Sequence, residues 1–291
     1  MNTELIWENH PKLHRPVLVA GFKGWNDAAD SASAAVDWLA TNLAGRPFAH
    51  IDPERYYDFQ TTRPHVSVRD GVTERITWPT NEFSAATGTT SNHDFIILRG
   101  VEPHFGWRTF CEAVVLVARE NACELVVTFG ALLADVPHTR IPTITGTATD
   151  PDLIARLGLE RSRYEGPTGI VGVLHDVCAR AGLVSASLWA PVPHYVASAP
   201  DPMASRELVS RFAQLTGLDI DLTELDLAAE GWRNRVSAAV VGDSDTAAYV
   251  EELEGRFDAE ISEPGLGNLP TGDDLAAELE RYLREQRDDE K

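Results

Sequence analysis

The sequence predicts an α/β fold with a mixed, largely parallel sheet. Short apolar runs alternate with segments in which apolar residues recur every three or four positions, the spacing of an amphipathic helix. Two apolar runs, 95–98 and 125–129, are joined by one such segment. A helix between two buried strands is the connection that a parallel sheet requires. The first domain is therefore expected to be α/β.

The first unit of this fold lies in residues 17–43. The apolar run 17–20 predicts a strand, glycines follow it, and apolar residues then recur at helical spacing until Gly45. Asn26 or Asp27 can cap the helix, and Gly24 can take backbone angles closed to other residues. Trp25 either covers the sheet edge or is an exposed contact. Loop aromatics are mostly packing residues, which favours the cover.

The later elements follow in chain order. Asp70-Gly71 between alternating residues is typical of a tight β-hairpin, whereas the glycine, proline and threonine of 130–149 indicate a long loop. The expected elements are strand 48–51, hairpin 66–78, strand 95–98, helix 106–121, strand 125–129, loop 130–149, short helix 153–157, helix 169–181, strand 187–190 and helix 205–216.

Beyond residue 218 only helical patterns remain. Apolar stripes span 222–236, 249–257 and 275–283, and this last part of the chain holds 21 acidic and 7 basic residues. We therefore divide the chain into an α/β domain, 1–218, and an acidic helical C-terminal extension, 219–291. Such narrow stripes must be buried against the domain or against another subunit, so we expect an interface near Tyr249, Phe257 and Leu279.

Composition excludes several classes of partner. The formal net charge of −20 repels phosphate backbones and anionic lipid, which argues against nucleic-acid and membrane partners. Three cysteines without a C-x-x-C pair are typical of reduced core thiols in the cytoplasm. The first residues do not show a basic region followed by an apolar run, and no apolar run is long enough to span a membrane. We therefore expect a cytoplasmic protein.

Three histidines, each preceded by proline, follow predicted strands: His104, His138 and His194. Their wide spacing favours structural roles over a zinc site shared with Asp135, so neither metal nor cofactor is expected. In the loop of Asp135, His138 and Arg140, the histidine could act as a base. Alternatively, the three side chains could be struts, that is, they could form hydrogen bonds that only support the structure. The struts are favoured because no serine or threonine is marked as a nucleophile.

The segment Gly166-Pro167-Thr168-Gly169 precedes a helix whose free amides could bind phosphate or carboxylate. Its glycine spacing is not that of a dinucleotide fingerprint, and the lysine of a P-loop is missing. Proline and threonine at a helix start are ordinary, which favours a structural role. His175 and Asp176 are expected on a solvated helix face.

Seven segments in chain order carry a resemblance to a known family. They are Gly21 to Asp30, Ile51-Asp52, 57–60 with Arg63-Pro64, Trp78-Pro79, 134–140, 164–169 and Pro193-His194-Tyr195. Together they resemble the proteasome assembly chaperone 2 family in its bacterial form. The resemblance implies a three-layer α/β/α domain of the phosphorylase/hydrolase-like kind, a role in binding proteins, and a homo-oligomer, a trimer in bacterial relatives.

We therefore expect a non-catalytic cytoplasmic protein-binding factor, with proteasome subunits as the partner that the resemblance implies. The alternatives are a small-molecule-binding protein or hydrolase/phosphorylase-like enzyme using the C-terminal edge of the sheet, and a scaffold that docks through its acidic helices. The expected binding surface at that edge comprises Gly24, Trp25, Asn26, Asp27, Asp135, His138, Arg140, Gly166, Thr168 and His194. No catalytic residue is assigned.

Overall fold

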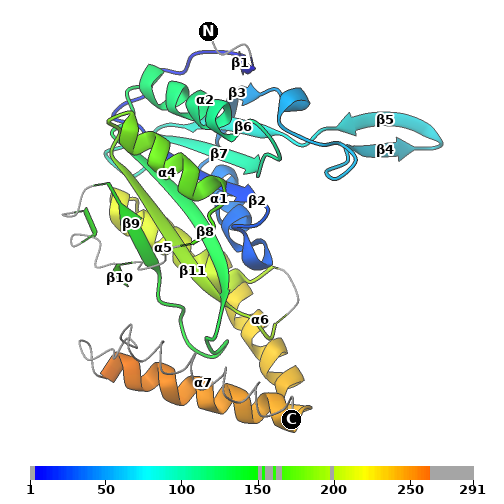
Figure 1. Ribbon diagram of the computed structural model, residues 1–291, viewed down its shortest axis with the longest axis vertical. Helices are drawn as coiled ribbons and strands as arrows, with labels where there is room; N and C mark the ends of the chain where they lie inside the picture. The colour runs from blue at the N-terminus through cyan, green and yellow to red at the C-terminus, as the bar shows by residue number, and fades with distance from the viewer. Residues whose placement is uncertain (1–3, 150–152, 155–159, 162–165, 197–199, 263–291) are drawn as a thin grey trace, which may run out of the picture.

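A computed structural model describes residues 4–149, 153–154, 160–161, 166–196 and 200–262. Its described strands form a nine-stranded sheet, in the order β1-β3-β6-β7-β2-β8-β11-β9-β10, and a separate two-stranded ribbon (Figure 1). The elements are β1 Leu5–Trp7, β2 Val17–Lys23, α1 Ser31–Asn42, β3 Arg46–Ile51, β4 His65–Arg69, β5 Val72–Thr77, β6 Asn81–Ala86, β7 Phe95–Val101, α2 Trp107–Glu120, β8 Leu125–Ala134, β9 Thr145–Ala148, β10 Glu160–Arg161, α4 Ile170–Arg180, β11 Ser185–Pro193, α5 Pro202–Thr216, α6 Thr223–Val241 and α7 Ser244–Ser262.

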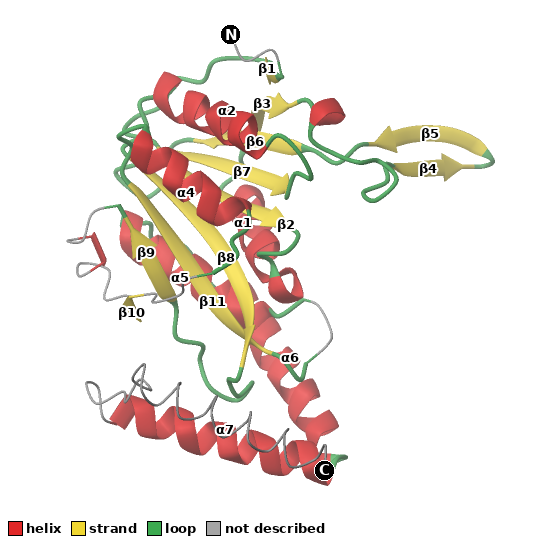
Figure 2. Ribbon diagram, in the orientation of Figure 1, coloured by secondary structure: helices red, strands yellow, loops and turns green. Residues whose placement is uncertain are grey.

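Helices cover both faces of the sheet, so the predicted three-layer α/β/α architecture is confirmed (Figure 2). The four central strands, β7, β2, β8 and β11, are parallel. Along β2, Val17 and Val19 pack toward α1 and α5, whereas Leu18 and Ala20 pack toward α2 and α4. This alternation explains the continuous apolar run of the sequence, because a strand buried on both faces has no polar side.

Strands β8 and β11 are longer than the sequence predicted. They pair in parallel from Ser185 opposite Val126 to Pro193 opposite Ala134. The expected loop 130–149 also contains a strand, β9, which pairs antiparallel with β11. Gly130 was interpreted as the start of that loop. It is instead a strand residue, and a Cβ there would lie 2.6 Å from Cε3 of the Trp189 ring, so the glycine leaves room for an aromatic neighbour.

The other sequence assignments largely hold. The predicted hairpin is present, although it stands outside the main sheet, and β1 and β6 were not predicted. Only 153–154 of the expected helix 153–157 are described, and the third stripe, 275–283, lies outside the described residues. Dividing the chain after residue 218 stays a prediction.

The apolar stripes predicted on α6 and α7 are covered within the chain, whereas Leu227 and Val241 of α6, outside those stripes, are exposed. Leu225 and Trp232 of α6 and Val250 and Leu253 of α7 are buried, and the ring of Tyr249 packs on those of His194 and Tyr195. The inference of an interface near Tyr249 and Phe257 assumed that these stripes were uncovered, so its reason is lost, and Leu279 lies outside the described residues. Homo-oligomerisation stays a prediction that needs a different surface.

All three cysteine thiols are free, as expected. Cys111 and Cys178 are buried and Cys123 is half-buried. Burial raises the pKa of each thiol to about 12, which keeps the sulfur neutral and unreactive at physiological pH. Among the described residues, no helix is both long and apolar enough to cross a membrane.

Candidate functional site

The turn after β2 and the start of α4 are tied together by one carboxylate. Glu102, directly after β7, accepts a hydrogen bond from the Trp25 backbone N–H at 2.9 Å and another from the Ile170 N–H at 2.8 Å. Ile170 is the first residue of α4, so the carboxylate also faces the positive end of a helix. We call Trp25, Asn26, Asp27, Glu102 and Gly169 the turn cluster. Glu102 was not among the residues predicted from the sequence.

Two polar residues of the turn cluster are buried and serve the backbone. Asp27 Oδ1 accepts hydrogen bonds from the N–H groups of Ala32 at 2.7 Å and Ser33 at 3.0 Å, which confirms the predicted cap. Burial raises the pKa of this carboxyl. The Asn26 carbonyl accepts from the Ala131 N–H at 2.8 Å, joining the turn to β8. That contact is made by the Asn26 backbone, whereas its side-chain Oδ1 accepts from the Val171 N–H of α4 at 3.5 Å. Both buried residues therefore hold the turn in place.

The two glycine turns meet at this point. A Cβ at Gly169 would lie 2.0 Å from Asn26 Oδ1 and 2.6 Å from Glu102 Oε1, so only glycine allows so close an approach. Thr168 lies over the first turn of α4, because a Cβ at Gly172 would be 2.0 Å from its hydroxyl oxygen. Gly166 is exposed.

The turn is strained and carries an exposed tryptophan. Ala29 and Asp30 have φ values of 50° and 51°, and residues other than glycine keep such backbone angles only where the surroundings enforce them. Gly24, at φ 141°, takes a conformation open to glycine. Trp25 is 64% exposed. The expectation that its ring covers the sheet edge was therefore wrong: the backbone N–H is bound to Glu102 while the side chain faces solvent.

The residues predicted in the loops after β8 and β11 form a second group, which holds helices α6 and α7 against the α/β domain. His138 is 2% exposed, its Nδ1 is 2.8 Å from the Tyr195 hydroxyl, and its Nε2 is 3.0 Å from Ser237 Oγ on α6. The His138 backbone N–H also donates to Tyr195 Oη. The ring meets that of Trp232 edge-on, with the centroids 6.4 Å apart. Both nitrogens of the imidazole are thus occupied by structural contacts.

Charged side chains extend this group to α7. Arg140 binds Asp258 with two hydrogen bonds of 2.8 Å and lies 3.4 Å from Glu254, and the Thr139 hydroxyl also donates to Glu254. His194 Nδ1 is 3.1 Å from Asp135. Bidentate arginine–carboxylate pairs fix geometry well. We call Asp135, His138, Thr139, Arg140 and His194 the docking group, of which Thr139 was not singled out in the sequence.

The structure thus divides the predicted surface into two parts. The Gly24–Asp27 turn and the Gly166–Gly169 turn meet at Glu102, whereas Asp135, His138, Arg140 and His194 contact α6, α7 and each other. Within the described part of the chain, no hydrogen bond or ion pair joins the two groups. The roles of these residues in binding stay a prediction.

Acidification is expected to loosen the contact between His138 and α6. Burial lowers the pKa of His138 below its ordinary value of 6.5, so the unfolded chain binds a proton more readily than the folded one. Stability from this site is therefore complete above about pH 6.5 and is lost as the pH falls through the folded-state pKa. Urea midpoints measured between pH 7.5 and 5 should fall less for His138→Gln than for the natural chain. Equal slopes would contradict the prediction.

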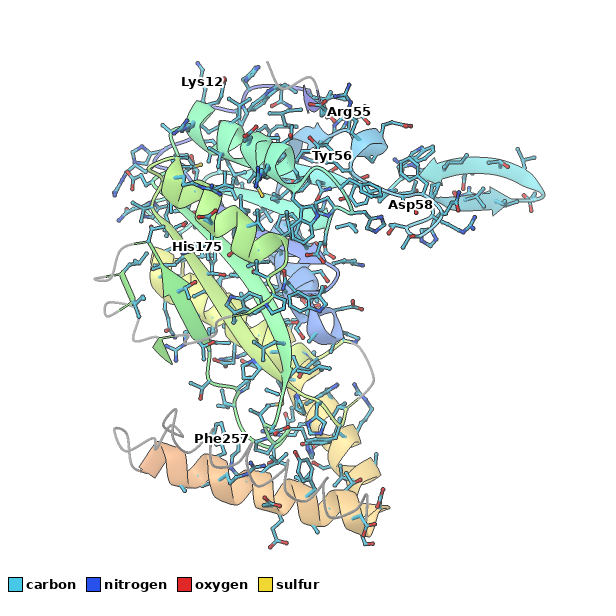
Figure 3. The ribbon with its side chains drawn as sticks, viewed as in Figure 1. Lys12, Arg55, Tyr56, Asp58, His175 and Phe257 are labelled. Carbon is cyan, nitrogen blue, oxygen red and sulfur yellow. The ribbon has the colours of Figure 1, made fainter. Side chains whose placement is uncertain are left out.

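Other histidines are structural as well. His104 Nδ1 accepts a hydrogen bond at 3.0 Å from the N–H of Asp58, which Figure 3 labels near the base of the β4–β5 ribbon. His175 is half-buried, with Nδ1 3.0 Å from Ser185 Oγ, so placing it on a solvated helix face was wrong. Among the described residues, no three His, Cys, Asp or Glu side chains are grouped so that they could hold a metal ion.

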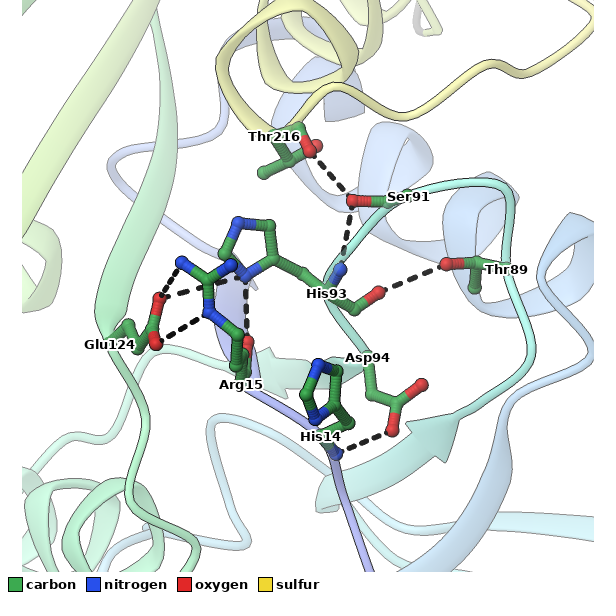
Figure 4. A network of polar contacts seen from close by, with 8 residues as sticks. All are labelled: His14, Arg15, Thr89, Ser91, His93, Asp94, Glu124 and Thr216. Atoms are coloured by element: carbon green, nitrogen blue, oxygen red, sulfur yellow. Dashed lines mark hydrogen bonds and ion pairs between the residues drawn. The ribbon is translucent and has the colours of Figure 1, made fainter.

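The opposite edge of the sheet holds a polar network whose members bind one another (Figure 4). Arg15 and Glu124 form two hydrogen bonds of 2.9 and 3.0 Å, His93 Nδ1 is 2.7 Å from the Arg15 carbonyl, and Ser91 donates to the Thr216 carbonyl at 2.7 Å. These contacts join the loops that precede β2, β7 and β8. Such mutual pairing indicates a structural tie rather than a binding site.

A groove of about 360 Å³ lies between α5, α6 and the loop after β8. Its lining residues are Ile141, Pro142, Met203, Arg206, Glu207, Asp226, Ala229, Glu230 and Arg233. Arg206 of α5 binds Asp226 of α6 at 2.8 Å, which joins the two helices, and also contacts its neighbour Glu207 on α5 at 2.5 Å. The groove is therefore lined by both signs of charge, and the residues of the turn cluster do not line it.

Fold and site together define an α/β/α protein whose loop histidines and carboxylates hold structure while a rigid turn presents an aromatic side chain. The family model described as the PAC2 family matches residues 21–240, and the chain belongs to this family. The match extends through most of α6, beyond the segment that carried the resemblance in sequence.

Solved structures agree with this assignment. A PAC2 family protein from Streptomyces avermitilis is 46% identical, with a TM-score of 0.75 over 81% of this chain and 99% of that one. A proteasome-assembly chaperone homologue from Mycobacterium tuberculosis is 40% identical, with a TM-score of 0.75 over 80% and 99%. PbaB of Pyrococcus furiosus, an archaeal proteasome activator, is 20% identical with a TM-score of 0.64 over 81% and 97%, which shows a shared fold. No curated protein matches the chain.

Proposed function

We propose that this protein is a non-catalytic, chaperone-like binding factor of the cytoplasm, and that Trp25 anchors its protein partner. The observation that carries the proposal is the exposed indole on a turn fixed by Glu102, Asn26 and Asp27. Tryptophan is enriched among residues that dominate binding energy, and a rigid support lowers the entropy lost on association. The turn therefore offers a preorganised contact.

The family supplies the class of partner. One structural relative is a proteasome-assembly chaperone homologue at 40% identity, which supports proteasome-related proteins as partners of this chain. We propose proteasome subunits as that partner and a homo-oligomer as the working form. The acidic character of the chain suits a partner with a basic surface.

The enzyme alternative has less support from the geometry. A general base must come within hydrogen-bond reach of its substrate. His138, the only base that the sequence analysis put forward, is buried and has both ring nitrogens bonded to Tyr195 and Ser237. These contacts fit a structural role for His138 better than the role of a catalytic base.

Trp25→Ala should weaken binding to proteasome subunits without changing the unfolding midpoint. Truncating an anchoring tryptophan costs about 2 kcal/mol or more, so we expect about a thirtyfold loss of affinity or more. Calorimetry with purified proteasome α and β subunits measures it. Leu227→Ala is the matched control, because Leu227 on α6 is 66% exposed and outside the turn cluster. Equal affinities of the natural chain and Trp25→Ala would remove the anchor, and no binding by the natural chain would remove the proposed partner.

A further inference from the structure

The exposed side of α6 carries a row of uncharged residues. Leu227 and Val241, at its two ends, are 66% and 82% exposed. Asn234 and Ala238 are exposed as well, and Gly231 is half-buried. Successive members of the row are four, three, four and three positions apart, which is the spacing of the a and d positions of a coiled coil. We call these five residues the outer row of α6. It has the pattern of a helix face that receives a second helix.

The middle of the outer row is small and lies open. Apart from its chain neighbours and the backbone of α6, a Cβ added at Gly231 would meet only Nη1 of Arg235, at 3.4 Å. Ala238 likewise contributes a single methyl group. In packed helices, large side chains of one helix insert into holes on the other, and small residues make such holes deep. Arg235 flanks the row and is exposed, and the structure describes no ion pair for it. The complement of this face is therefore a row of large apolar residues with acidic neighbours.

The chain itself supplies such a row, in the sequence beyond the described residues. Leu275, Leu279, Tyr282 and Gln286 are four, three and four positions apart, the spacing of the outer row. Glu278 and Glu280 stand on either side of Leu279. A helix of this length is marginal in water on its own, and packing of its apolar face is what stabilises such helices in proteins. The segment therefore needs a surface on which to pack.

The linking chain is long enough to bring the two rows together. Helix α7 begins directly after the turn that ends α6, so Val241 lies near its start and Ser262 is at its far end. With 19 residues, α7 is about 28 Å long. Residues 263–274 follow, and about twelve residues of extended chain can span about 40 Å. Leu275 can therefore return to Val241, and the segment after it then runs antiparallel to α6.

We propose that residues 275–286 form a helix that docks antiparallel on the outer row of α6 in the same chain. Large side chains then fill the small positions of α6. Glu280 comes level with Arg235 and offers it a carboxylate partner, whereas Leu227 lies beyond the end of the contact. The facing pairs are Val241 with Leu275, Ala238 with Leu279, Asn234 with Tyr282 and Gly231 with Gln286.

Disulfide formation in the full chain tests the pairing. Ala238→Cys combined with Leu279→Cys should form a disulfide within one chain when oxidised glutathione is added, because facing positions of packed helices lie close enough for the bond. Ala239→Cys with Leu279→Cys is the matched control. Ala239 is exposed but points about 100° away from the outer row, so this pair should link about tenfold more slowly or less. The natural thiols of Cys111 and Cys178 are buried and unreactive.

Hydrogen exchange tests the docking without new cysteines. Amides of residues 279–286 should exchange about tenfold more slowly than in an unstructured chain, or slower still. Ala238→Asp should abolish this protection, because it places a charge inside the contact. Ala239→Asp is the matched control and should keep it. Amides of β2 and β7 should stay protected in both variants, which shows that the sheet remains folded.

Each other outcome overturns a stated part. Unprotected amides at 279–286 in the natural chain would show that no helix docks there. If the protection survives Ala238→Asp, or if both cysteine pairs link at the same rate, the segment docks on another surface and the contact with α6 is wrong. A disulfide that joins two chains, seen as a doubled mass in denaturant, would place the contact between copies. Binding through Trp25 is measured separately by calorimetry, so these outcomes leave the proposed function to its own test.

Discussion

Glu102→Ala should destabilise the protein by about 2–3 kcal/mol and should also weaken partner binding as strongly as Trp25→Ala. The carboxylate accepts hydrogen bonds from the N–H groups of Trp25 and Ile170, at 2.9 and 2.8 Å. Hydrogen bonds to charged groups contribute about 1.5–3 kcal/mol each, and the half-exposed position of Glu102 reduces that value through solvent screening. Without the carboxylate, the turn after β2 keeps only the longer hydrogen bond of 3.5 Å from the Val171 N–H to Asn26 Oδ1 as a described hydrogen bond to α4.

Glu102→Gln is the matched control, because its amide oxygen can replace one of the two acceptors. It should lose about half as much stability as Glu102→Ala. Trp25→Ala separates the two effects, since it removes the exposed ring and leaves the backbone N–H bonded to Glu102. Urea unfolding gives the stability and calorimetry the affinity. Unchanged midpoint and affinity in Glu102→Ala would show that the turn is held by Asn26 and Asp27 alone.

The turn cluster shows what the sequence could and could not predict. The glycine turn and the Asp27 cap were predictable because their signals lie within a few residues of one another. Glu102 was missed because its partners lie 77 and 68 positions away. An acidic residue between a strand end and a proline was the available signal, although it does not reveal which helix start the carboxylate will meet.

The docking group was only half predictable for the same reason. Residues 134–140 were recognised as a polar loop after a strand, and a structural role for His138 was favoured. Its contacts depend on Ser237, 99 positions later in the chain, and on a helix whose position no local pattern gives. The length of β8 was missed because Gly130 has the composition of a loop, whereas its reason for being glycine is the ring of Trp189 on a neighbouring strand.

Trp232→Ala should release α6 and α7 from the domain, at a cost of about 3–5 kcal/mol to their docking. Trp232 is 4% exposed, and its ring faces that of His138 in the docking group. Losing the ring leaves a cavity beneath α6. More of the docking would then depend on polar contacts, namely those of Arg206 with Asp226, of His138 with Ser237 and of Arg140 with Glu254 and Asp258. Partly exposed ion pairs contribute little by themselves, which is why the loss should be local opening of the helices.

Hydrogen exchange measures this opening directly. The amides of Val250 and Leu253 should lose protection in Trp232→Ala, while those of the β2 and β7 strands keep theirs. Trp232→Phe is the control. The indole N–H is buried without an acceptor in the described structure, so phenylalanine removes an unsatisfied donor and should stay within about 1 kcal/mol of the natural chain. Uniform loss of protection throughout the sheet would instead show that α6 and α7 unfold only with the whole domain.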